Sequence, residues 1–115
     1  MQGCRENSLH PKTLDLIRKF NDAKKPIATV CVAAFALAES GILKDRKATV
    51  YHLDNGKTQK ELAEYGVNVI NEPVVVDENI ITSYCSQTAP LVAFKLLEML
   101  IGVEKTKEVS AAMGY

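Results

Sequence analysis

Ile27-Ala28-Thr29-Val30-Cys31-Val32-Ala33-Ala34 contains a change from strand to helix around which the rest of the chain can be arranged. Its first four residues are short, apolar and partly β-branched, which is typical of a strand buried on both faces. The residues from Val32 to Glu39 are rich in alanine and leucine, which favour a helix. Ser40-Gly41 then ends that helix, with glycine as its C-terminal cap. The sequence therefore predicts a buried strand that passes directly into a helix, with Cys31 at the junction.

Helices are predicted on both sides of this junction. On the amino-terminal side, Ser8-Leu9-His10-Pro11 is typical of a helix entry, because proline suits the first helical position. Pro26 follows a charged segment that ends this helix, and His10 is expected to cap it. On the carboxyl-terminal side, Thr58 and Glu61 have the spacing of a capping box, which predicts a helix that runs to Tyr65.

The remaining predicted elements are short strands and two further helices. Strands are expected at 48–51, 67–70, 74–76 and 80–82, the last two as strand, turn, strand. A long helix is expected from Thr88 to about Ile101. Its apolar residues cover more than one stripe, so it should be largely buried. One last short helix is predicted over residues 104–113.

This alternation of strands and helices predicts an α/β fold with a mainly parallel sheet. The chain of 115 residues is long enough for one small domain. A helix precedes the first strand, so the sheet begins late and only two or three parallel strands are available. That is few strands for a sheet that has to be covered on both faces.

Composition excludes several classes of protein. Hydrophobic residues make up 47% and charged residues 24%, as in ordinary globular proteins. The 14 basic and 14 acidic residues balance, which argues against a general binder of nucleic acid or acidic membranes. There is neither a membrane-spanning apolar run nor the pattern of a signal peptide. Three cysteines do not make a disulfide framework, so we expect free thiols in the cytoplasm.

Cys31 is the leading candidate for a functional residue. A residue between a buried strand and the next helix lies at the carboxyl end of the strand, where open α/β sheets bind their ligands. The start of a helix favours the thiolate form of a cysteine. The backbone N–H of Val32 would point to the same place and could stabilise an oxyanion. The alternative is an ordinary structural cysteine, because free cysteine is among the most buried residue types.

The other candidates are weaker. His52 follows a predicted strand and could take the proton of the Cys31 thiol, although a surface position is the simpler reading. Cys85 lies in a polar loop before a helix, which could face the same crevice, and Cys4 lies in the opening loop. No cysteines and histidines are paired at ligand spacing, so we expect neither a metal nor a cofactor. The charged clusters Lys24-Lys25 and Lys44-Asp45-Arg46-Lys47 are expected to be solvated loops.

Three separated segments resemble the ThiJ/PfpI family, which includes a parkinsonism-associated deglycase and is class I glutamine-amidotransferase-like. These segments are Pro26 to Ala34, Leu37 to Thr49, and Val74 to Ser83 followed by Thr88-Ala89. The resemblance implies a flavodoxin-like three-layer sandwich. It also implies that residues 1–115 are the carboxyl-terminal portion of one such domain, an incomplete version that lacks the first strands. The absent stretch would hold an acidic residue that hydrogen-bonds the cysteine.

The resemblance also implies roles for individual residues. Cys31 matches the family's elbow cysteine, and Val32 matches the residue whose N–H lines the oxyanion site. Protease-type members carry histidine directly after the cysteine, so Val32 argues against peptidase activity. The histidine of deglycase-like members falls at Tyr51, with His52 one residue later. The family's Arg-Gly-Pro-Gly segment is replaced by Tyr84-Cys85-Ser86-Gln87, which changes the rim of the pocket.

Three functions remain open from the sequence. The first is a cofactor-independent, cysteine-dependent hydrolase, glyoxalase or deglycase that acts on a small reactive carbonyl compound. The second is a cysteine-based sensor of oxidative stress, or a chaperone, in which the same thiol is oxidised. The third is a truncated, inactive chain. An uncovered sheet edge would favour a homo-oligomer or association with the missing amino-terminal half.

Overall fold

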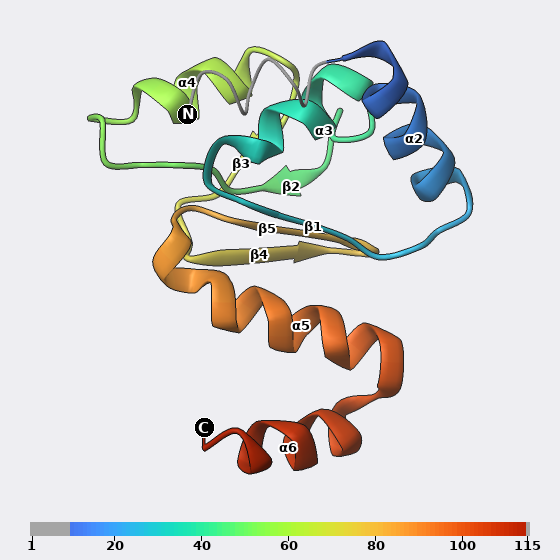
Figure 1. The fold of residues 1–115 in the computed structure, drawn as a ribbon. Coiled ribbons are helices and arrows are strands. Elements are labelled where there is room, and N and C mark those ends of the chain that lie inside the picture. The colour runs from blue at the N-terminus through green and yellow to red at the C-terminus, as the bar shows by residue number, and fades with distance from the viewer. Residues whose placement is uncertain (1–9, 115) are drawn as a thin grey trace.

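A three-stranded sheet separates two layers of helices (Figure 1). The computed structural model describes residues 10–114. The elements in chain order are α2 (Pro11–Asp22), β1 (Ile27–Val30), the 3-10 helix η1 (Cys31–Ala33), α3 (Ala34–Ser40), β2 (Lys47–Ala48), α4 (Lys57–Ala63), β3 (Asn68–Val69), β4 (Val74–Asp77), β5 (Ile80–Ser83), the 3-10 helix η2 (Ser86–Thr88), α5 (Ala89–Ile101) and α6 (Val103–Ala112). Among these elements, α2, α3 and α4 lie on one side of the sheet, and α5 and α6 lie on the other.

The sheet has the strand order β1-β5-β4. β1 and β5 run parallel, with Ile27 opposite Ile80 and Val30 opposite Ser83. β4 and β5 form the expected antiparallel hairpin. β2 and β3 form a separate parallel pair on the side of α3 and α4. Because β1 and β5 are parallel and in register, the carboxyl ends of both strands lie at the same end of the sheet, which we call the carboxyl edge.

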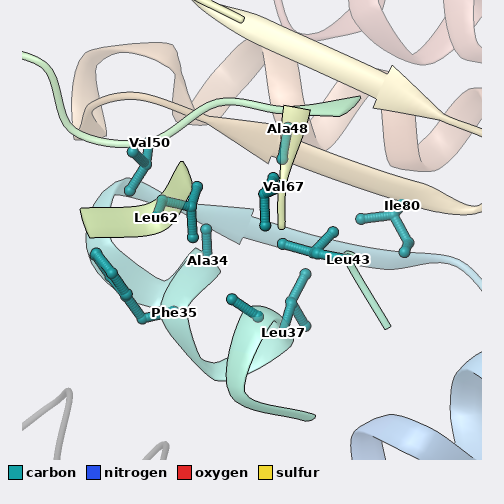
Figure 2. Packing of buried hydrophobic residues seen from close by; sticks show 10 residues of the cluster. Ala34, Phe35, Leu37, Leu43, Ala48, Val50, Leu62, Val67 and Ile80 are labelled. Atoms are coloured by element: carbon teal, nitrogen blue, oxygen red, sulfur yellow. The ribbon is translucent and has the colours of Figure 1, made fainter. Parts of the chain in front are cut away.

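The hydrophobic core lies between the sheet and α3 (Figure 2). Six of the seven residues of α3 are buried, and Phe35 and Leu37 are almost completely inaccessible to solvent. Leu43, Leu62 and Ile80 come from three other segments and complete the cluster. The alanines of α3 allow the helix to lie close to its neighbours, which fixes the position of the η1 turn directly before it.

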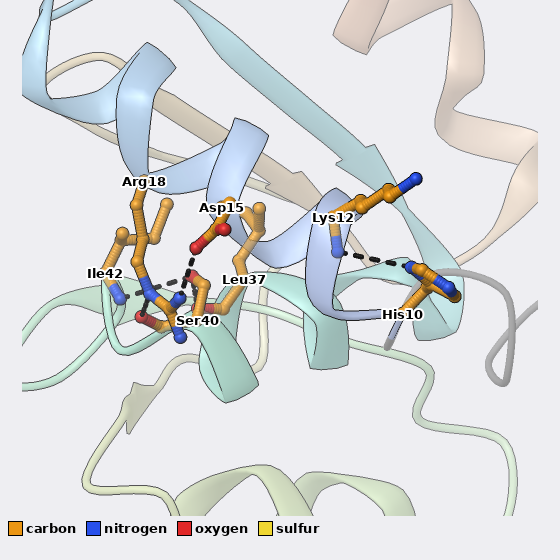
Figure 3. Close-up of polar contacts among 7 residues, drawn as sticks. All are labelled: His10, Lys12, Asp15, Arg18, Leu37, Ser40 and Ile42. Carbon is orange, nitrogen blue, oxygen red and sulfur yellow. Dashed lines mark hydrogen bonds and ion pairs between the residues drawn. The ribbon is translucent and has the colours of Figure 1, made fainter.

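Polar contacts attach α2 to the end of α3 (Figure 3). The Nε of Arg18 donates a hydrogen bond of 2.9 Å to the carbonyl oxygen of Ser40, the last residue of α3. A cation at a helix C-terminus stabilises the carbonyl groups that have no partner within the helix. His10 caps α2 as expected, because its Nδ1 accepts a hydrogen bond from the N–H of Lys12 at 3.2 Å.

Two helices differ from their predictions. The helix α4 begins at Lys57, so Thr58 is not its cap and the capping box does not form. Asp54 instead accepts hydrogen bonds from the N–H and the hydroxyl of Thr58. In α5 only Val92 is buried, although the apolar composition of the helix predicted a largely buried one. No helix in the described part of the chain is both long and apolar enough to cross a membrane.

Candidate functional site

Cys31 lies at a tight bend between β1 and the helical segment that follows. Val30 is still extended, with φ −125° and ψ 139°, and Ala34 is already helical. Cys31 itself has φ 61°, in the left-handed region that side chains disfavour by about 1–2 kcal/mol. Its thiol is half-buried and forms no disulfide. Strained backbone of this kind persists where the surrounding structure enforces it, and it clusters at functional sites.

The residues after the bend hold it in place. Val32 is the second residue of the η1 turn, and its half-buried side chain packs against the hydrophobic core. Ala34, directly after the turn, is completely buried. The first backbone N–H groups of a helix lack acceptors within the helix. The N–H of Val32 is one of these donors, and it could stabilise an oxyanion.

The parallel pairing of β1 and β5 places the loop after β5 beside Cys31. Val30 lies opposite Ser83, so Cys31 and Tyr84 are the next residues at the same edge of the sheet. The hydroxyl of Ser83 also donates to the carbonyl oxygen of Thr29, at 3.3 Å. Cys85 is half-buried and forms no disulfide, and its carbonyl oxygen accepts a 2.6 Å hydrogen bond from the Thr88 hydroxyl.

His52 meets this loop through an aromatic contact. Its imidazole stacks on the ring of Tyr84, with centroids 3.9 Å apart and planes 16° apart. The Nδ1 atom of His52 is buried and has no hydrogen-bond partner. No hydrogen bond joins the His52 ring to the Cys31 thiol in the described part of the chain. The structure therefore brings His52 to Tyr84, and Tyr84 to the edge that carries Cys31.

Sequence reasoning placed Tyr84 at the rim of the pocket but gave it no role of its own. An aromatic pair contributes about 0.5–1.5 kcal/mol beyond its burial, whereas a buried polar atom without a partner costs about 1–3 kcal/mol. The stack therefore offsets part of the cost of burying Nδ1. A signal was present in the sequence, because Tyr84 directly follows a strand and its aromatic ring is out of place in an otherwise polar loop.

The charged clusters lie away from Cys31. Arg46 donates to the side chains of Glu78 and Asn79, at 3.3 and 3.2 Å. Asn79 directly precedes β5, so these contacts lie at the opposite end of β5 from Tyr84. A hollow of about 630 Å³ at this end is lined mainly by polar residues, among them Lys24 and Arg46. Lys24, Lys25 and Lys44 are exposed, as expected for solvated loops. The prediction is wrong for the end of the second cluster, because Arg46 is half-buried and Lys47 is the exposed first residue of β2.

Two expectations concern metals and Cys4. Across residues 10–114, no group of three or more His, Cys, Asp or Glu side chains could hold a metal ion. Cys4 lies outside the described residues.

Comparison with known proteins places this chain in a family. The DJ-1/PfpI family profile matches residues 1–99, which is most of the chain. The chain belongs to the DJ-1/PfpI family. This match confirms the family resemblance of the sequence, and the flavodoxin-like architecture is that of the family's solved structures.

Two relatives and one solved structure show how much of a DJ-1/PfpI protein this chain covers. Deglycase PfpI of Pyrococcus furiosus is 35% identical over 75 residues, 65% of this chain and 43% of that protein. Glutathione-independent glyoxalase DJ-1 of Schizosaccharomyces pombe is 31% identical over 110 residues, 93% of this chain and 54% of that protein. The crystal structure of Drosophila melanogaster DJ-1beta is 28% identical, with a TM-score of 0.83 over 98% of this chain and 59% of its own. The chain thus spans about half the length of these relatives.

Proposed function

We propose that this chain carries the thiol centre of an enzyme that acts on small reactive carbonyl compounds. The observation that carries the proposal is the left-handed backbone of Cys31, φ 61°, between a strand and a core helix. Such a bend presents a nucleophile at the carboxyl edge of a sheet. Relatives of the chain are named as a deglycase and a glyoxalase, which supports a carbonyl substrate such as a glyoxal or a glycated adduct.

The proposed chemistry begins with attack of the Cys31 sulfur on an aldehyde carbon. An S–C bond forms, and the electron pair of the C=O bond moves to oxygen, where the Val32 N–H stabilises the negative charge. His52 is the candidate base for the thiol proton. For a dicarbonyl substrate, a proton then moves from the attacked carbon to its neighbour, which turns the adduct into a thioester. Water hydrolyses this thioester, so the S–C bond breaks and a 2-hydroxy acid and the free thiol are released. One carbon is oxidised and its neighbour is reduced, so no external oxidant or cofactor is consumed.

We also propose that this activity belongs to an assembly in which a further polypeptide segment lies against β1. Among the described strands, none pairs with the outer edge of β1. An apolar hollow of about 190 Å³ opens between α2 and the start of β1, lined by Leu16, Ile17, Phe20, Pro26 and Ile27. Longer relatives keep the arrangement of this chain and add further structure, which favours such a segment over a second copy. A carboxylate partner for Cys31 would come with this segment.

Consumption of methylglyoxal and formation of lactate test the proposed activity. The Cys31→Ser variant should lose at least about 100-fold in rate, because serine is a far weaker nucleophile at neutral pH. Cys85→Ser is the matched control, and it should stay within about threefold of the unaltered chain, since its thiol is not at the strained bend. Equal rates for Cys31→Ser and the unaltered chain would contradict the proposal, and so would a larger loss at Cys85 than at Cys31.

A further inference from the structure

We infer that Tyr84 is a positioning residue, whose ring holds the His52 imidazole at the sheet edge beside Cys31. The inference rests on the proposed function for the roles of Cys31 and His52. It adds a residue that no part of that mechanism includes, in a loop where the chain departs from the pattern of the family it resembles.

The first support is the geometry of the ring contact. A centroid distance of 3.9 Å and an interplanar angle of 16° describe a nearly parallel stack. Both residues are half-buried. A stack of this kind fixes the plane of the imidazole, which a surface histidine could otherwise rotate freely.

The second support is a buried hydrogen bond that fixes the two segments relative to each other. The N–H of Thr49 donates to the hydroxyl of Thr82 at 2.9 Å, and both residues are completely buried. Thr49 lies three residues before His52, and Thr82 lies two residues before Tyr84. The segment after β2 and the segment after β5 therefore reach the sheet edge in a fixed relation, which brings the two rings together.

The third support is the buried Nδ1 of His52. This atom has no partner, so water would draw the ring outward if nothing held it. Tyr84 supplies the contact that retains it. With Nδ1 turned into the protein, Nε2 is the nitrogen that can serve the thiol of Cys31 or a bound carbonyl.

The simpler alternative is that Tyr84 only fills space at the edge of the fold. The two roles differ in their consequences. A space-filling residue affects stability, whereas a positioning residue acts on Cys31 only through His52. Substitutions at Tyr84 and His52 should then not have additive effects on the thiol.

Nuclear magnetic resonance tests the stack directly. The chain contains two histidines, so His10, which caps α2, provides an internal reference. In the unaltered chain the ring protons of His52 should be shifted upfield of those of His10 by the Tyr84 ring. Tyr84→Phe should retain this shift, and Tyr84→Leu should abolish it while the His10 signals stay unchanged. An upfield shift that persists in Tyr84→Leu would overturn the inference.

Alkylation of Cys31 by iodoacetamide, followed by peptide mass spectrometry, tests the coupling without requiring any enzymatic activity. His52→Gln and Tyr84→Leu should each slow alkylation of Cys31, by about tenfold for the loss of a positioned base. Tyr84→Phe should restore the rate. The double variant should react within about twofold of His52→Gln alone.

Two outcomes of the alkylation experiment would overturn the inference. Additive losses would show that Tyr84 acts on Cys31 independently of His52. An unchanged rate in His52→Gln would show that the imidazole does not serve the thiol. Because neither readout uses a carbonyl substrate, failure of the proposed enzymatic activity remains distinguishable from failure of this inference.

Discussion

At the scale of single residues, the conformation of Cys31 is the feature most easily tested. Among residues 10–114, five non-glycine residues have positive φ, and four of them, Lys24, Asp45, Asn55 and Glu78, lie in turns or loops near exposed surface. Cys31 alone among these five lies between a strand of the central sheet and a buried helix. The packed core therefore imposes the strained backbone conformation on Cys31.

This strain gives a prediction about stability. Glycine adopts a positive φ readily, so Cys31→Gly should be more stable than Cys31→Ala by about 1 kcal/mol. The order is the reverse of that at an ordinary position, where glycine is less stable than alanine by about 0.5–1 kcal/mol. Urea unfolding of the two variants provides the measurement.

Ala33 supplies the control for this prediction. It lies two residues further along, with φ −63°, so Ala33→Gly should destabilise the chain. If Cys31→Ala proves at least as stable as Cys31→Gly, the bend is not strained as described.

The residue scale also shows what could be predicted about the site. The composition of 27–41 was sufficient to place Cys31 between a strand and a helix. The contact between His52 and Tyr84 was not predicted, because it depends on how the segment after β2 packs against β5. These residues are 32 positions apart in the chain, and no local pattern reports a contact of that range.

At the scale of elements, the start of α4 depends on one carboxylate. The side-chain hydrogen bond from Thr58 lowers the pKa of Asp54 below its ordinary value of 3.8. A carboxylate with a lowered pKa in the folded state stabilises the protein above its unfolded pKa. That stabilisation is lost as the pH falls through the folded value.

We therefore expect Asp54→Asn to be less stable than the unaltered chain at pH 7. The difference should shrink below pH 4 and vanish once Asp54 is protonated. Thermal unfolding midpoints of both proteins across this range provide the measurement. Asp22→Asn, at an exposed position in the last turn of α2, is the control. A difference that persists unchanged at acid pH would show that the charge of Asp54 is irrelevant to the cap.

The same elements show why sequence patterns succeeded in some places and failed in others. The start of α2 at Pro11 and the hairpin of β4 and β5 follow local rules, and both were predicted. The strand expected at 48–51 is only Lys47–Ala48, because the N–H of Thr49 donates to a side chain, the Thr82 hydroxyl. Side-chain acceptors of this kind cannot be recognised from hydrophobic periodicity.

At the scale of the whole molecule, the two ends of the central sheet differ in character. The carboxyl ends of β1 and β5 carry Cys31, Tyr84 and Cys85, whereas the opposite end carries the polar contacts of Arg46. The long helix α5 is apolar nearly throughout, yet Leu91 and Leu100 are exposed. Exposed apolar residues on a helix, and a strand edge with which no described strand pairs, are typical of surfaces that associate.

The proposed association gives a prediction that a matched pair of leucines can test. The probe is the part of Drosophila melanogaster DJ-1beta that this chain does not cover, produced as a separate polypeptide. Leu16 is 54% exposed and lines the hollow beside β1, whereas Leu53 is 68% exposed in the loop before α4. The unaltered chain should bind the probe in a 1:1 complex, measured by calorimetry and by light scattering after gel filtration. Leu16→Asp should weaken binding at least about tenfold, because it places a charge in an apolar contact, and Leu53→Asp should leave it unchanged.

Two outcomes would speak against this association. If no complex forms at about 100 µM of each polypeptide, the proposal is contradicted, because specific complexes bind more tightly than this. A stable dimer of the chain itself that Leu16→Asp dissociates would show instead that a second copy occupies this surface.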